Sequence, residues 1–141
     1  MRYVLLVLAL AGVVVSGLAL HVHYSNDVQA CSINEKWDCG IVNHSPFAEI
    51  AHVPVAVFGI LGYLALGGLA IARQRFPLFV VTLIGFCFAL RLTFIEEFAL
   101  GAWCIYCVIS QAIIALTLLL SLGWLAAEYY ALKRDHAPTA V

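Results

Sequence analysis

The chain has 141 residues, of which 65% are hydrophobic and only 11% are charged. An average soluble domain carries about 25% charged residues, and a soluble domain of this length could not bury so much apolar surface. The formal net charge of −1 lacks the basic excess of a nucleic-acid-binding protein. Length and composition therefore predict one integral membrane domain over residues 1–141, with no nucleic acid as partner.

Four long segments are nearly free of charged residues, and each meets the length of about 20 apolar residues that a membrane-spanning helix needs. The predicted spans cover residues 3–22, 53–72, 76–95 and 103–126. The apolar run that contains the last span begins at Phe98, and we assign residues 98–103 to a connection outside the membrane. The sequence thus predicts an all-α bundle of four transmembrane helices.

The basic residues predict the orientation, because lysine and arginine are enriched on the cytoplasmic side of membrane proteins. In a four-span arrangement one side receives Arg2, Arg73, Arg75, Lys133 and Arg134. The loops of the other side contain Lys36 alone. We therefore expect a plasma (inner) membrane protein with both termini in the cytoplasm. The loop of residues 23–52 is then periplasmic or otherwise extracytoplasmic.

Acidic residues and histidines gather on the predicted outer side. The acidic residues are Asp27, Glu35, Asp38, Glu49, Glu96 and Glu97, and the histidines are His21, His23, His44 and His52. We interpret the histidines as interfacial polar residues in preference to a metal cluster. Arg91 lies inside the third span near its outer end, and its side chain is expected to reach the interface toward Glu96 or Glu97.

Four of the five cysteines form two pairs on this outer side. Cys31 and Cys39 lie in the loop, and Cys104 and Cys107 form a Cys-x-x-Cys motif that opens the fourth span. Disulfides form and persist on the oxidising side of a membrane. Cys87 lies in the middle of the third span and is interpreted as a small buried apolar residue.

A Cys-x-x-Cys motif at the start of a helix favours redox chemistry. The unpaired N–H groups and the helix dipole stabilise the thiolate, which is the reactive form of cysteine. Cys104 and Cys107 share one helix face, and Cys107 lies deeper by about 4.5 Å, at about 1.5 Å per residue. We expect one thiol at the aqueous edge and the other in the apolar interior. A zinc site and two inert disulfides are the alternatives.

These features, in this order, resemble the vitamin K epoxide reductase family. The family pattern has seven residues between the loop cysteines, as in "CSINEKWDC", and a serine six residues after the second, which is Ser45 here. Leu20 and His21 at the end of the first span also match. So do Phe58 and Gly59 in the second span and "CIYC" at the start of the fourth. The resemblance covers nearly the whole chain.

The resemblance implies a four-helix bundle around a quinone, covered by the outer loop and a short interfacial cap helix between the first two spans. The candidate for the cap helix is "SPFAEIAHV", with Ser45 as its N-cap and Pro46 at its first position. Phe47 and Ile50 would then face the quinone. Ordinary packing is the alternative for Phe47.

The resemblance also implies an electron relay. A reduced thioredoxin-like or DsbA-like periplasmic protein would attack the loop disulfide at Cys31, and Cys39 would exchange with Cys104. The second pair would pass two electrons to ubiquinone or menaquinone, with Cys107 beside the ring and no metal involved. Many bacterial relatives carry a fused thioredoxin-like domain. Because this chain stops at Val141, its partner is expected to be a separate protein.

Two positions depart from the animal enzymes of the family. The second-span asparagine that binds their quinone aligns with Val55, and the tyrosine four residues after their second active cysteine aligns with Gln111. Together with Phe47 and Phe58, these residues are the predicted quinone contacts. The departures favour a bacterial-type thiol oxidase over a vitamin K epoxide reductase. A DsbB-type oxidase, where the order of the cysteine pairs is reversed, and a scaffold with structural disulfides are further alternatives.

Overall fold

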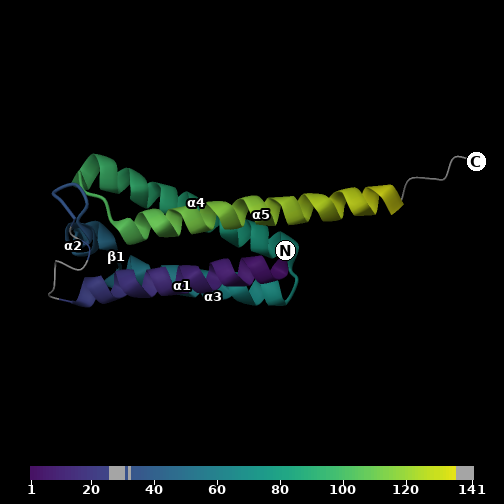
Figure 1. Ribbon diagram of the computed structural model, residues 1–141, viewed down its shortest axis with the longest axis horizontal. Coiled ribbons are helices and arrows are strands. Elements are labelled where there is room, and N and C mark those ends of the chain that lie inside the picture. The colour runs from purple at the N-terminus through teal and green to yellow at the C-terminus, as the bar shows by residue number, and fades with distance from the viewer. Residues whose placement is uncertain (26–30, 32, 136–141) are drawn as a thin grey trace, which may run out of the picture.

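The computed structural model describes residues 1–25, 31 and 33–135, so Asp27 lies outside the described residues. Within them, four long helices run along the molecule (Figure 1). They are α1 (Arg2–Tyr24), α3 (Val55–Ile71), α4 (Arg75–Ile95) and α5 (Ile105–Asp135). The short elements are α2 (Cys39–Asn43), η1 (Pro46–Ala48), β1 (Glu49–Ile50), β2 (Val53–Pro54) and the π-helical turn η2 (Glu96–Leu100).

Three helices in the described part of the chain are long and apolar enough to cross a membrane: Arg2–Tyr24, Arg75–Leu100 and Ile105–Arg134. Helix α3 is also apolar but has only 17 residues. Large apolar side chains remain exposed on the outside of the bundle, among them Val7, Leu10 and Val14 on α1. Water does not favour such a surface, whereas lipid does. The chain is an all-α membrane protein.

Helix α1 packs on α3 through a face of mostly small residues. The buried positions recur every three or four residues, at Leu5, Ala9, Gly12, Ser16 and Ala19, and so share one side of the helix. The ring of Tyr63 from α3 lies directly over Gly12, where a Cβ atom would overlap it. The Tyr63 hydroxyl donates to the carbonyl oxygen of Ser110 at 3.0 Å. This ring therefore joins α1, α3 and α5.

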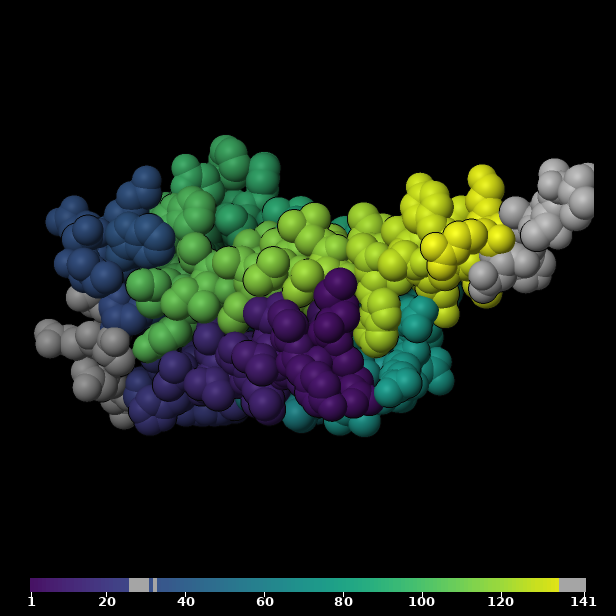
Figure 2. Space-filling model, turned by 45° about the vertical axis from the view of Figure 1, so that its right-hand side comes forward, coloured from purple at the N-terminus to yellow at the C-terminus, as the bar shows by residue number. Residues whose placement is uncertain are grey.

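The end of the bundle that lies away from α2 carries the basic residues that the sequence analysis assigned to the cytoplasmic side. The turn from α3 to α4 is short, and Arg75 opens α4. Arg75 Nη1 contacts Glu128 Oε1 of α5 at 2.8 Å, and its guanidinium carbon lies 5.1 Å from the centre of the Trp124 ring. The last turns of α5 project beyond the other helices (Figures 1 and 2).

The prediction of a cap helix in "SPFAEIAHV" is wrong for most of this segment. Only η1, a single 3₁₀ turn, is helical, and β1 then pairs with β2 in an antiparallel hairpin. Ser45 and Pro46 take the N-cap and first positions of η1, as expected, but the Ser45 side chain makes no capping hydrogen bond. Its hydroxyl donates to the carbonyl oxygen of Val42 at 2.8 Å. Ala51 and His52 have positive φ angles of 52° and 65°, and this turn directs the chain into α3.

The short helix of the loop is α2, which the sequence analysis did not predict. Asp38 caps it, since its Oδ1 accepts hydrogen bonds from Gly40 N at 2.8 Å and from Ile41 N at 3.1 Å. The connection before α5 is also shorter than expected. Residues 96–100 continue α4 as η2, and the chain turns at Gly101, which has a φ of 62°.

The close approach at Gly12 gives a test of the α1–α3 packing. We predict that Gly12→Ala lowers the free energy of unfolding by about 1–3 kcal/mol, because the added methyl group overlaps the held Tyr63 ring. Gly17→Ala is the matched control, since no neighbouring atom lies within 4 Å of its Cβ position. It should be neutral or stabilise α1 by up to about 1 kcal/mol. Thermal unfolding in detergent compares the two, and equal effects would contradict this packing.

Candidate active site

Two backbone hydrogen bonds dock the loop against the segment that precedes α5. The Trp103 N–H donates to the Lys36 carbonyl at 2.8 Å, and the Asp38 N–H donates to the Trp103 carbonyl at 3.1 Å. Cys39 follows Asp38 in the chain, and Cys104 follows Trp103. The docking therefore brings one cysteine of each pair to the same place.

The structure gathers four cysteines at this end of the bundle. Cys31 and Cys39 form a disulfide, whereas Cys104 and Cys107 are free thiols. Cys39 and Cys104 are both 0% exposed and belong to one apolar cluster, against which Cys31 and Cys107 pack. Cys87 lies apart and is exposed on α4, so its interpretation as a buried residue is wrong. In a membrane protein that surface faces lipid.

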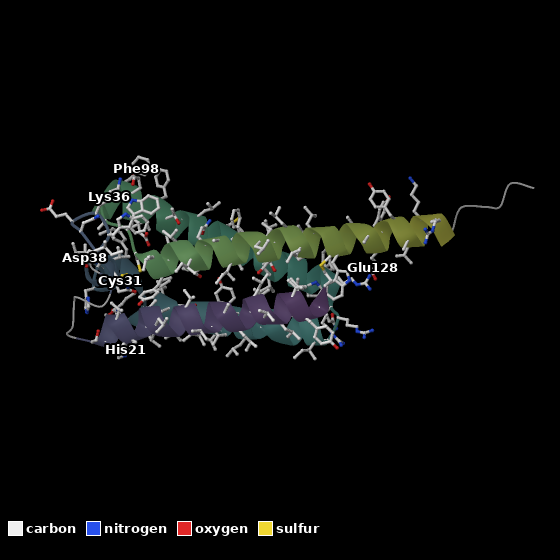
Figure 3. All side chains as sticks on the ribbon, viewed as in Figure 1. His21, Cys31, Lys36, Asp38, Phe98 and Glu128 are labelled. Carbon is white, nitrogen blue, oxygen red and sulfur yellow. A yellow bond between two sulfur atoms is a disulfide. The ribbon has the colours of Figure 1, made fainter. Side chains whose placement is uncertain are left out.

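Figure 3 shows where this end lies in the bundle. Cys31, Lys36 and Asp38 are together with His21 at the end of α1, and Glu128 lies toward the other end. Glu128 is the partner of Arg75, so the cysteines and the predicted cytoplasmic arginines are at opposite ends of the helices.

Cys104 occupies the N-cap position of α5, which begins at the next residue. Its sulfur accepts hydrogen bonds from the thiol and the backbone N–H of Cys107, and from Asn43 Nδ2 at 3.4 Å. The hydrogen bond from the Cys107 thiol is the main reason why the pKa of Cys104 lies below that of an ordinary thiol; burial and the Glu96 charge oppose it. We expected Cys104 at the aqueous edge. It is fully buried because the docked loop covers it.

Asn43 is a site residue that the sequence analysis missed. It is 7% exposed, and its Nδ2 also donates to the carbonyl oxygen of Cys39 at 2.9 Å. Asn43 thus binds both cysteines that the docking brings together. The only sequence signal is its position one helical turn after Cys39, which has meaning only once α2 is known.

Glu96 is the second missed residue. Its side chain points into the protein and is 2% exposed, although the sequence placed it among the outer acidic residues. Glu96 Oε2 accepts a hydrogen bond from the Cys104 N–H at 3.3 Å, and the carboxylate also forms a hydrogen bond with the Cys107 thiol. A carboxylate therefore contacts both residues of the Cys-x-x-Cys motif.

Arg91 does not join Glu96, contrary to expectation. The Arg91 side chain is exposed, and among the described residues it forms no ion pair with Glu96 or Glu97. Glu97 accepts a hydrogen bond from Trp103 Nε1 at 2.9 Å instead. Two neighbouring glutamates thus have opposite surroundings, one buried at the thiols and one at the surface.

A cavity of about 190 Å³ lies beneath the loop, between the four long helices. Cys107 is on its wall, whereas Cys104 is not. Its other polar wall residues are Ser16, His23, Asn43, Ser45, Tyr63, Thr93, Glu96, Tyr106 and Ser110. Most of the remaining wall is aliphatic or aromatic, as is typical of a site for an apolar ligand.

Three of the four predicted quinone contacts line this cavity: Phe47, Val55 and Phe58. Gln111 is not among the lining residues, and its Oε1 is buried without a hydrogen-bond partner in the described structure. The contact predicted for it has no support from the cavity. Ile50 lines a smaller neighbouring cleft together with Arg91.

Two histidines of this end, His23 and His44, are engaged in hydrogen bonds. His23 Nε2 contacts Glu49 Oε1 at 3.3 Å, and its Nδ1 bonds the carbonyl oxygen of Asn43. His44 Nδ1 bonds the carbonyl oxygen of Gly40 at 2.9 Å. No group of three or more His, Cys, Asp or Glu side chains suited to a metal ion occurs in the part of the chain that the structure describes.

The donors around Cys104 give a second test. Removing a donor destabilises the thiolate, so Cys107→Ala and Asn43→Leu should both raise the pKa of Cys104, the first by more. The thiolate then appears only at higher pH. Ultraviolet thiolate absorbance against pH measures this, with Cys104→Ser subtracted to isolate its signal. An unchanged titration in both variants would contradict the assignment of these donors.

The comparison with known proteins agrees with this geometry. The sequence profile of the vitamin K epoxide reductase family matches residues 3–122, which include both cysteine pairs and the cavity wall. No curated protein matches the chain. With most of its length matched and its helices suited to a membrane, the chain belongs to the vitamin K epoxide reductase family and is a membrane oxidoreductase.

Proposed function

We propose that the protein is a quinone-dependent thiol oxidoreductase that generates disulfides in a thioredoxin-fold partner outside the cytoplasm. The observation that carries this proposal is the division of the Cys-x-x-Cys motif. Cys104 is buried against the loop cysteine Cys39, and Cys107 faces the cavity. One thiol is thus suited to exchange with the loop, and the other to pass electrons to an apolar acceptor.

The loop pair would receive the electrons from a separate thioredoxin-like or DsbA-like protein. Cys31 is partly exposed, whereas Cys39 is 0% exposed. A partner thiolate would therefore attack Cys31 and release Cys39 as a thiolate. Cys39 would then attack Cys104 of the oxidised Cys104–Cys107 pair, and Cys107 would leave with the electron pair. The second thiol of the partner would form the partner's disulfide and release Cys31, and Cys31 would attack Cys39 to restore the loop disulfide and release Cys104 as a thiolate. A loop pair that is oxidised and a second pair that is reduced would then be the proposed state before quinone reduction.

The cavity suits a quinone ring. Its volume of about 190 Å³ exceeds that of an engineered cavity of about 150 Å³ that accepts benzene. Phe47 and Phe58 would hold the ring, and Val55 leaves this part of the wall apolar. When bound, ubiquinone or menaquinone supplies an acceptor for two electrons and two protons. Cys107 is the thiol positioned to face it.

We further propose four membrane crossings, with both termini in the cytoplasm of the inner (plasma) membrane. Helix α3 is about 25 Å long, at about 1.5 Å per residue. This is slightly less than the hydrocarbon thickness of about 30 Å, a mismatch that membranes accommodate by local thinning. The separation of Lys36 from the arginines of the opposite end supports this orientation.

The relay is tested by separating its two halves. Cys107→Ala should abolish quinone reduction, because the thiol that faces the cavity is lost, while Cys31 can still form a mixed disulfide with the partner. Quinone absorbance in the reconstituted protein measures the first activity, and non-reducing gels measure the second. Cys87→Ala is the matched control and should behave as the unaltered chain, since Cys87 lies away from both pairs. Normal quinone turnover by Cys107→Ala would refute the proposed function.

A further inference from the structure

We propose that Glu96 is a catalytic residue that takes the proton of the Cys107 thiol and delivers it to the quinone oxygen in the cavity. This inference rests on the proposed function, because it assigns a proton carrier to the step that reduces quinone. It adds a residue that neither the cysteine pairs nor the predicted quinone contacts include.

The first argument is the position of the carboxylate. Glu96 contacts the Cys104 N–H at 3.3 Å and the Cys107 thiol, and its side chain also forms part of the cavity wall. A proton carrier must reach both the donor and the place where the acceptor binds. Among the described residues, Glu96 is the only carboxylic acid that lines this cavity.

The second argument is that the Cys107 thiol has one proton and two acceptors. It forms hydrogen bonds with the sulfur of Cys104 and with the carboxylate of Glu96. The Cys104 sulfur must bond to the Cys107 sulfur when the disulfide forms, so it cannot keep the proton. The carboxylate is then the base that already contacts the thiol.

The third argument is the cost of burial. Glu96 is 2% exposed, and it has no ion pair with any lysine, arginine or histidine of the described residues. Burying a carboxylate without a cation is expensive, and a hydrogen bond to one backbone N–H is a modest compensation. Its neighbour Glu97 shows that the same side chain can lie at the surface. A functional requirement explains why Glu96 does not.

The local backbone explains how Glu96 points inward. It is the first residue of η2, a π-helical turn of five residues that continues α4, and such turns are frequent at functional sites. Gly101 then reverses the chain with a φ of 62°. This reversal returns Cys104 to the level of Glu96, so its N–H can meet the carboxylate.

The step balances in atoms and electrons. It starts from the Cys104 thiolate, the Cys107 thiol and the Glu96 carboxylate. Glu96 takes the proton from the Cys107 sulfur, the two sulfurs bond to each other, and two electrons pass to the quinone. One quinone oxygen receives the proton held by Glu96, and the other receives a proton from water. The products are the Cys104–Cys107 disulfide, the quinol, the Glu96 carboxylate and the hydroxide ion left by the water that gave the second proton.

The other titratable groups around Glu96 are few. Cys107 and Tyr106 of α5 share the cavity wall with it. His23 of α1 and Tyr63 of α3 lie on the same wall. His23 is occupied by Glu49 and by the Asn43 carbonyl. Of these groups, Cys107 is the one that contacts the carboxylate.

The test uses the full chain in lipid with quinone and a reduced thioredoxin-fold substrate. Glu96→Gln keeps the shape and the acceptor for the Cys104 N–H but cannot carry a proton. Quinone reduction should fall about 100-fold, the contribution typical of one acid–base group. Glu97→Gln is the matched control and should not change the rate. Glu96→Asp should recover part of the loss, and it serves as the decisive variant if Glu96→Gln does not fold.

A second readout needs no quinone. The Glu96 charge opposes the thiolate of Cys104, so Glu96→Gln should shift the Cys104 thiolate titration to lower pH. A more readily formed thiolate together with slower turnover supports proton transfer, because the electrostatic effect alone would not slow the reaction. Unaltered turnover in Glu96→Gln, with an active wild type, overturns the role of Glu96 but not the proposed function. An inactive wild type with properly formed disulfides overturns both.

Discussion

The docking of the loop on Trp103, in the segment before α5, is the interaction on which the site depends. Two backbone hydrogen bonds join Trp103 to Lys36 and Asp38, and the rings of Trp37 and Trp103 pack with their centres 6.0 Å apart. Without this contact Cys39 would have no fixed position relative to the membrane helices. With it, Cys104 is removed from water, and the cavity is covered from the loop side.

Burial by the loop changes the chemistry of the thiols it covers. Asn43 donates both to the Cys39 carbonyl and to the Cys104 sulfur, so its amide protons are already used. It therefore does not replace the quinone-binding asparagine of the animal enzymes, whose position is taken by Val55. Glu96 brings a negative charge next to the same thiols. The site combines a stabilised thiolate at Cys104 with a nearby carboxylate, a combination suited to moving electrons and protons separately.

The sequence predicted the long helices well, because a chain in lipid must satisfy its backbone hydrogen bonds within each span, and apolar runs mark those spans. The grouping of Cys39 with Cys104 followed from the family pattern. The loop was harder to predict. Helix α2 and the β1–β2 hairpin are too short to have a strong local signal in the sequence.

Single residues were missed for the same reason. Nothing in "IEEF" distinguishes Glu96 from Glu97, and only the widened turn η2 directs one inward. Gln111 was expected to contact the quinone because it stands where the animal enzymes of the family have a tyrosine. The cavity lies instead on the side of Ser110, three residues after Cys107. The rotation of α5 about its own axis decides which of these two side chains faces a ligand. That rotation depends on how α5 packs against the other helices.

The exchange between the two cysteine pairs is the central claim, and one cross-link tests it most directly. A Cys31→Ala, Cys107→Ala double variant leaves Cys39 and Cys104 without their partners, with Cys87 as a reference thiol. The account predicts that mild oxidation joins Cys39 to Cys104 within one chain, as peptide mass spectrometry would detect, and that Cys87 stays free. If Cys39 and Cys104 both remain reduced, or if Cys39 joins only a second chain, the proposed relay is contradicted.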